Sequence, residues 1–100
     1  MKKHRIYVSG AMSSRPREEY RAHFAAAEHG LRKKGYKVFN PCRWQWFLRF
    51  LPYKACLAFD VFMMMFCDGI YMLDGWSVSD GARAENQYAL STGMIILFER

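Results

Sequence analysis

Four short apolar runs occur along the chain, each followed by a polar or turn-forming residue. They are rich in β-branched and aromatic side chains, as is typical of buried β-strands. The sequence therefore predicts four strands, at residues 6–8, 36–39, 70–73 and 94–98.

Between these runs, three longer segments repeat apolar residues every three or four positions, which is the pattern of an amphipathic helix. The segments are 17–34, 53–66 and about 80–91. The first carries Tyr20, Phe24, Ala27 and Leu31 on one face, with Glu28 expected among the charges of the outer face. The second is expected to be a buried helix, with Leu57, Val61, Met64 and Met65 facing inward.

Residues around the third helix have clear end signals. Ser79 or Asp80 is suited to cap its start, and Gly93 to close its end. The aromatic and basic segment 42–52 has no clear period, so a short helix and a folded loop both remain open.

This alternation of strands and helices predicts an α/β fold. We expect one three-layer, flavodoxin- or Rossmann-like domain over residues 1–100, with a four-stranded parallel sheet in the order 2-1-3-4. That order creates a switch point between the first and third strands, where ligands bind in such sheets. The expected crevice lies between residues 9–15 and residues 74–85.

Composition adds expectations about partners. The chain is 52% hydrophobic and 17% aromatic, which predicts a homo-oligomer, a dimer or larger. The aromatic stretch 44–50 favours a hydrophobic cover or subunit contact over a platform for stacked bases. The net charge of +6 suits an anionic small molecule such as a phosphate, whereas nucleic acid is not the expected partner because no binding module is visible.

Other features of the sequence argue against a secreted, a membrane-spanning or a metal-binding protein. The start of the chain does not resemble a secretion signal, and charged residues and proline interrupt its most apolar region, so no membrane span is expected. Cys42, Cys56 and Cys67 lack metal-binding spacing and are expected to be reduced thiols in a cytoplasmic protein. We expect neither a metal nor a cofactor.

Glu85 is the first candidate for chemistry, because it follows the third strand in the early turns of a helix. A carboxylate there can attack an anomeric carbon or stabilise an oxocarbenium-like transition state, and the helix N-terminus would keep it ionised. Asp60 is the second candidate, since an acid in an apolar helix is costly unless it is hydrogen-bonded. Both residues could instead be solvated helix carboxylates, with Glu85 paired to Arg83.

Further candidates surround the expected crevice. The small-residue loop after the first strand could hold a phosphate or be an ordinary turn, and it contributes Ser9, Gly10, Met12, Ser13 and Arg15. Tyr7 could pack in the core or orient Glu85. Asp74 could end the strand or reach a ligand, and Trp76 could be a lid or stack on a base.

Several motifs together resemble a known family. They are IYVSGAMS near the start, GYKVFNP, Asp60 eight residues before Asp68, CDGIYMLDGW and SDGARAENQYALSTG. The pattern GW-x-x-S-x-GA-x-x-E from Gly75 to Glu85 is the most specific. The chain resembles the DUF4406 family over nearly its whole length, a family frequent in phage and bacterial genomes and similar to the nucleoside 2-deoxyribosyltransferase superfamily.

This resemblance implies roles for particular residues. Glu85 matches the nucleophile that attacks C1′ of deoxyribose, Asp60 the acid that helps the base leave, and Tyr7 the phenol that orients the glutamate. The loop from Gly10 to Arg15 matches the segment that binds the 5′ end or a 5′-phosphate. Substrate contacts are also predicted for Asp74, Trp76, Ser79, Gly81 and Arg83. The resemblance further implies a dimer or larger assembly, because in the related enzymes neighbouring subunits complete each site.

The chain also departs from the transferases. Ser79 stands near the position of a further acid, with Asp80 beside it, which leaves recognition of the sugar hydroxyls open. Asn86 and Gln87 replace an apolar residue and a glycine, and Arg83 is a feature of the DUF4406 group that could pair with Glu85 or bind an anion.

The leading hypothesis is therefore a nucleotide-processing enzyme that cleaves or exchanges the N-glycosidic bond of a (deoxy)nucleoside or its 5′-monophosphate. One alternative is a non-catalytic module that binds or sequesters a nucleotide, such as a phage could encode. A purely structural oligomer is the third.

Overall fold

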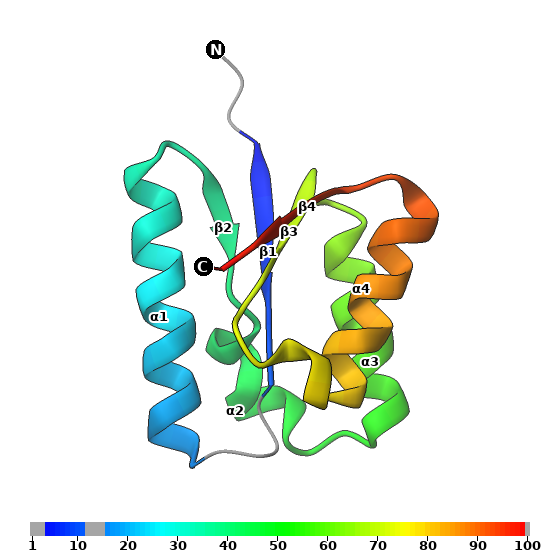
Figure 1. Cartoon of the computed structure of the whole chain (residues 1–100). Coiled ribbons are helices and arrows are strands. Elements are labelled where there is room, and N and C mark those ends of the chain that lie inside the picture. The colour runs from blue at the N-terminus through cyan, green and yellow to red at the C-terminus, as the bar shows by residue number, and fades with distance from the viewer. Residues whose placement is uncertain (1–3, 12–15, 100) are drawn as a thin grey trace.

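The structure, a computed structural model, describes residues 4–11 and 16–99. Its centre is a sheet of four parallel strands (Figure 1), namely β1 (Arg5–Ser9), β2 (Lys37–Phe39), β3 (Gly69–Met72) and β4 (Ile95–Phe98). The strand order is β2-β1-β3-β4, and every neighbouring pair is parallel. The predicted fold class and strand order are confirmed.

Helices cover both faces of this sheet. Helix α1 (Arg17–Lys33) lies on one face, and α3 (Tyr53–Met64) and α4 (Asp80–Thr92) lie on the other (Figure 1). Ser79 caps α4 by accepting a hydrogen bond from the backbone N–H of Ala82, and Gly93 ends it with a φ of 74°. None of the helices in the described residues is long and apolar enough to cross a membrane.

The segment that the pattern left open forms two short helical turns. A 3₁₀ turn, η1 (Pro41–Trp44), leads directly into α2 (Gln45–Leu48). Asn40 starts η1, because its side chain accepts a hydrogen bond from the backbone N–H of Cys42 at 3.0 Å. A second 3₁₀ turn, η2 (Trp76–Val78), precedes α4.

Strand β1 divides its side chains between the two layers. Ile6 and Val8 pack towards α1, whereas Tyr7 belongs to the core on the side of α3 and α4. Because side chains alternate along a strand, Ser9 shares the face of Tyr7. This alternation brings a phenol and a hydroxyl from one strand to the same side of the sheet.

Two expectations about helix faces are wrong. Glu28 is 4% exposed and lies on the inner side of α1, because it is four residues from Phe24 and three from Leu31 on the same helix face. Met64, the last residue of α3, is buried as expected, but Met65, which follows it, is 65% exposed. Phe62 and Phe66 are exposed as well, so the last turn of α3 and the residues that follow it present apolar side chains outward.

Candidate active site

A cavity of about 170 Å³ opens beside the carboxyl end of β1. Residues of β1, α1, η1, α3 and α4, together with the loops after β1 and before α4, line it: Tyr7, Ser9, Gly10, Phe24, Pro41, Tyr53, Asp60, Ser79, Gly81, Ala82 and Glu85. Its volume is close to that of an engineered protein cavity of about 150 Å³ that accommodates benzene, so its enclosed part fits one ring-sized group.

Glu85 lies at the inner wall of this cavity and is 6% exposed. The Tyr7 hydroxyl donates a hydrogen bond to Oε2 of Glu85 at 2.7 Å, and the Ser9 hydroxyl donates one to Oε1 at 2.6 Å. Both carboxyl oxygens therefore accept from residues of β1. This arrangement fixes the orientation of the Glu85 carboxyl relative to the sheet.

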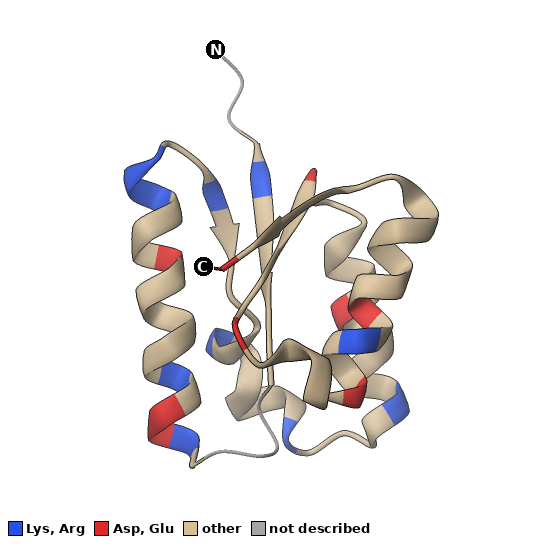
Figure 2. Cartoon of the chain, in the orientation of Figure 1, with Lys and Arg blue, Asp and Glu red and all other residues tan. Residues whose placement is uncertain are grey.

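Asp60 of α3 lines the same cavity and interacts with both Tyr7 and Glu85. In Figure 2 the acidic position of α3 lies beside an acidic position of α4, as this pairing requires. The Oδ1 atom of Asp60 is buried and has no hydrogen-bond partner among the described residues. One carboxyl oxygen is thus left for a group that the described chain does not supply.

The two acids have raised pKa values. Burial, followed by the charge of Asp60, raises the pKa of Glu85 from 4.5 to about 8. Burial also raises the pKa of Asp60, from 3.8 to about 6. The expectation that a helix N-terminus would keep Glu85 ionised is wrong, because Glu85 lies beyond the first turn of α4, where the dipole effect has faded, and desolvation dominates.

Two interacting carboxyls with these pKa values share one proton near neutral pH. Glu85 has the higher pKa, so the shared proton resides mainly on Glu85, although the hydrogen bonds from Ser9 and Tyr7 act to lower its pKa. Tyr7 stays a neutral donor, since burial and the neighbouring acids raise its pKa well above 10.0. When the shared proton passes from Glu85 to Asp60, the pair combines a carboxylate nucleophile with a general acid.

A second cavity of about 190 Å³ lies next to the first. Asp60 and Pro41 line both cavities, and Gln45, Leu48, Arg49 and Cys56 complete the second. Asp60 therefore stands where the two spaces meet. A ligand with two rings could place one ring on each side of this residue.

Three further predicted residues line the first cavity: Gly10, Ser79 and Gly81. A Cβ atom on Gly10 would lie only 2.9 Å from Cβ of Leu73, so the loop after β1 approaches the end of β3 too closely for a larger residue. The close approach of these two segments keeps the cavity next to the switch point of the sheet.

Other predicted residues lie away from this cavity. The Arg83 side chain pairs with Asp80, so it is not the partner of Glu85. Trp76 packs against Phe98 with ring centroids 6.1 Å apart, and Asp74 is exposed. None of Asp74, Trp76 and Arg83 is among the cavity-lining residues of the described chain. Met12, Ser13 and Arg15 lie outside the described residues.

Sequence reasoning missed four residues that line the cavity: Phe24, Pro41, Tyr53 and Ala82. Pro41 follows the carboxyl end of β2, so the same switch-point rule could have found it. Ala82 belongs to the GW-x-x-S-x-GA-x-x-E pattern. Phe24 fits an ordinary core position and Tyr53 an ordinary helix start, so neither has a distinct sequence signal.

No group of three or more His, Cys, Asp or Glu side chains in the described part of the chain could hold a metal ion. The thiols of Cys42, Cys56 and Cys67 are free. Burial raises the pKa of Cys42 to about 12 and that of Cys67 to about 11, so neither is a reactive thiolate near neutral pH. Glu85, Asp60, Tyr7 and Ser9 are therefore the groups of this site that could take part in chemistry.

Comparison with known proteins finds one family. The family model described as "Domain of unknown function (DUF4406)" matches residues 4–98. No curated protein matches the chain. The matched region includes every described residue of the cavity.

Proposed function

This chain belongs to the DUF4406 family, and we propose that it cleaves or exchanges the N-glycosidic bond of a deoxynucleoside or nucleoside, or of its 5′-monophosphate. The proposal includes kinship with the nucleoside 2-deoxyribosyltransferase superfamily. It rests on residue chemistry at the cavity together with the resemblance of the GW-x-x-S-x-GA-x-x-E motif.

The observation that supports it most is the environment of Glu85. A carboxyl oriented by Tyr7 and Ser9 lies in a ring-sized cavity beside a second acid. Cleavage of a glycosidic bond needs a nucleophilic carboxylate at the anomeric carbon and an acid near the leaving group. Both groups face one small space here, as a single anomeric carbon requires.

The proposed reaction proceeds in two balanced steps. A Glu85 oxygen forms a bond to C1′ while the C1′–N bond breaks, and the bonding electrons leave with the base as it receives a proton from Asp60. Water then attacks C1′, the C1′–O bond to Glu85 breaks, and Asp60 takes the proton of the water. If a second base attacks in place of water, the result is transfer. Neither route needs a cofactor.

The two cavities suit this division of the substrate. We propose that the sugar occupies the first cavity against Glu85, and that the base extends past Asp60 towards the second. The unpartnered Oδ1 of Asp60 would then form a hydrogen bond with the base. The 5′ end would lie towards Gly10 and the loop that follows it, where Ser13 and Arg15 remain the candidates for a phosphate.

The test is chromatography for free base. We expect the protein to release base from at least one member of a panel of ribo- and deoxyribonucleosides and their 5′-monophosphates. Net charge and Arg15 favour a monophosphate, with water as the acceptor. Parallel reactions with an added acceptor base separate hydrolysis from transfer. If no member of the panel released free base, the proposal of glycosidic chemistry would be wrong.

A non-catalytic nucleotide-binding module is the second candidate, and one observation favours it. The raised pKa of Glu85, caused first by burial, opposes the ionised form that a nucleophile needs. Such a module would be stabilised thermally by a nucleotide from the same panel while releasing no base. Melting curves recorded beside the chromatography separate the two candidates.

We also propose a homo-oligomer, a dimer or larger, in the cytoplasm. Exposed aromatic side chains crowd the α2–α3 region, with Trp46 62% and Phe50 75% exposed. An apolar surface of this kind is usually covered by a partner. Light scattering of the purified protein should give at least twice the mass of 11.8 kDa; a monomer across a concentration series would contradict this assembly.

A further inference from the structure

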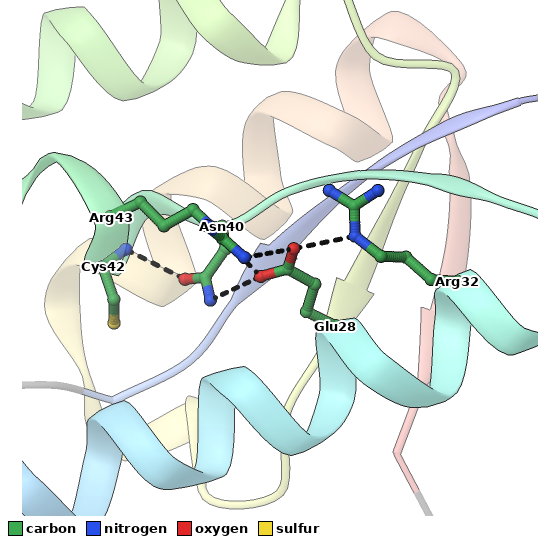
Figure 3. A network of polar contacts seen from close by, with 5 residues as sticks. All are labelled: Glu28, Arg32, Asn40, Cys42 and Arg43. Atoms are coloured by element: carbon green, nitrogen blue, oxygen red, sulfur yellow. Dashed lines mark hydrogen bonds and ion pairs between the residues drawn. The ribbon is translucent and has the colours of Figure 1, made fainter.

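Glu28 is a buried carboxylate outside both cavities. It is 4% exposed, yet it accepts hydrogen bonds from three side chains (Figure 3). Arg32 Nε donates at 2.8 Å and Asn40 Nδ2 at 3.1 Å, while Arg43 donates from Nε at 3.1 Å and from Nη2 at 2.9 Å. These bonds occupy both oxygens of Glu28.

Charge on Glu28 is favoured in this place. Burial acts to raise its pKa, but the hydrogen bonds from Arg43, Arg32 and Asn40 outweigh it, and the pKa falls below 4.5. Glu28 is therefore ionised at neutral pH. An ionised, buried carboxylate attracts its partners strongly, and the partners in turn are held in place.

Two of these partners belong to one short loop. Asn40 and Arg43 lie on either side of Pro41 and Cys42, and the Asn40 side chain also accepts the backbone N–H of Cys42 at 3.0 Å. Glu28 thus holds residues 40–43 against α1 from both ends. Arg32 differs, because it is on α1 itself and connects Glu28 to nothing in this loop.

Pro41 is the link to the candidate active site. It lines the first cavity with Glu85 and the second with Arg49, and it lines both with Asp60. Its position depends on the loop that Glu28 holds. We propose that Glu28 is a positioning residue, which acts through Asn40 and Arg43 to set the Pro41 wall common to both cavities. The link to substrate rests on the proposed function.

Loss of the negative charge on Glu28 should displace Pro41 from its place in the wall of the two cavities. Glu28→Gln keeps the size of the side chain but replaces one acceptor oxygen with a donor that faces other donors. Arg43→Gln removes the same contact from the loop side. Arg32→Gln is the matched control, because it removes a comparable ion pair with Glu28 but leaves the loop attached. Glu19→Gln is an exposed control on the same helix.

The thiol of Cys42 reports on the loop without any need for turnover. It is 5% exposed, and its pKa is raised to about 12 by burial. Alkylation with iodoacetamide at a temperature where every variant is folded, followed by peptide mapping, measures its exposure. Glu28→Gln and Arg43→Gln should each speed alkylation of Cys42 by about 10-fold or more, whereas Arg32→Gln and Glu19→Gln should match the unmodified protein.

Kinetics with the best substrate of the panel give the second readout. Both loop-releasing variants should lower kcat/KM by about 10-fold, since displaced walls misplace the substrate. The pH optimum should stay unchanged, because Glu85 and Asp60 are not altered. If no base is released by any protein, the proposed function fails while alkylation of Cys42 still decides whether Glu28 holds the loop.

Two results would overturn the inference. One is a Cys42 that remains as protected in Glu28→Gln and Arg43→Gln as in the unmodified protein. The other is an Arg32→Gln variant that behaves like Arg43→Gln, which would mean that the network only stabilises α1. Should Glu28→Gln fail to fold, the comparison of Arg43→Gln with Arg32→Gln decides the matter alone.

Discussion

Glu85→Gln is expected to abolish base release, lowering the rate by on the order of 10³-fold or more. An amide cannot supply the negative oxygen that attacks C1′, although it can still hydrogen-bond to Tyr7 and Ser9. The shape of the cavity should therefore survive while its chemistry is lost. The measurement is base release per mole of protein, with substrate in excess.

The matched control for this loss is Glu19→Gln, the same change at an exposed position. It should retain full activity. Circular dichroism of both variants establishes that they are folded. A Glu85→Gln variant with full activity would show that the attack on C1′ does not come from Glu85, and the proposed mechanism would have to be abandoned.

The same substitution should make the folded protein more stable at pH 8 and above. The pKa of Glu85 is raised to about 8 when folded, mainly by burial, against a usual 4.5. Between these values the unfolded chain binds fewer protons than the native state, so the carboxyl destabilises the fold increasingly as pH rises from about 4.5 to about 8. Glutamine removes that penalty, which is on the order of a few kcal/mol.

Thermal melting across this pH range measures the effect. The melting temperature of Glu85→Gln should exceed that of the unmodified protein by about 5 °C or more at pH 8. The difference should shrink as the pH falls and vanish below about pH 4.5, where the carboxyl is protonated in both the folded and the unfolded state. Asp60→Asn gives a check, since removing its charge lowers the pKa of Glu85 and should flatten the same dependence. If the difference in melting temperature did not change with pH, the pKa of Glu85 would not be raised in the folded protein.

Both effects arise from one arrangement. An acid placed for reaction in a dry cavity is an acid that costs stability at neutral pH. Tyr7 and Ser9 reduce that cost by donating to both oxygens of Glu85, and Asp60 raises it by its own charge. A gain in stability and a loss of turnover in one variant would therefore have the same physical origin.

The arrangement of strands and helices was largely determined by local patterns. Apolar runs of three to five residues that are rich in β-branched and aromatic side chains favour short strands, and the helical segments between them form the crossovers. Such crossovers imply parallel strands, and their handedness limits the topology to a few orders, of which the predicted order β2-β1-β3-β4 is the one observed. Glu85 was likewise singled out by its place after a strand.

Only the tertiary structure decided which polar side chains face one another. Glu28 lies on an amphipathic helix with many charged residues and Asp60 on an apolar one, yet in neither case could sequence alone tell a solvated carboxylate from a buried one. Burial of Glu28 depends on Asn40 and Arg43, which are 12 and 15 residues away, and burial of Asp60 depends on its contact with α4. The pKa of Glu85 is raised by desolvation and by Asp60, both of which exist only once α3 and α4 pack on the same face of the sheet. Local periodicity specifies a helix and its apolar side, whereas the electrostatics of the site depend on partners that are distant in sequence.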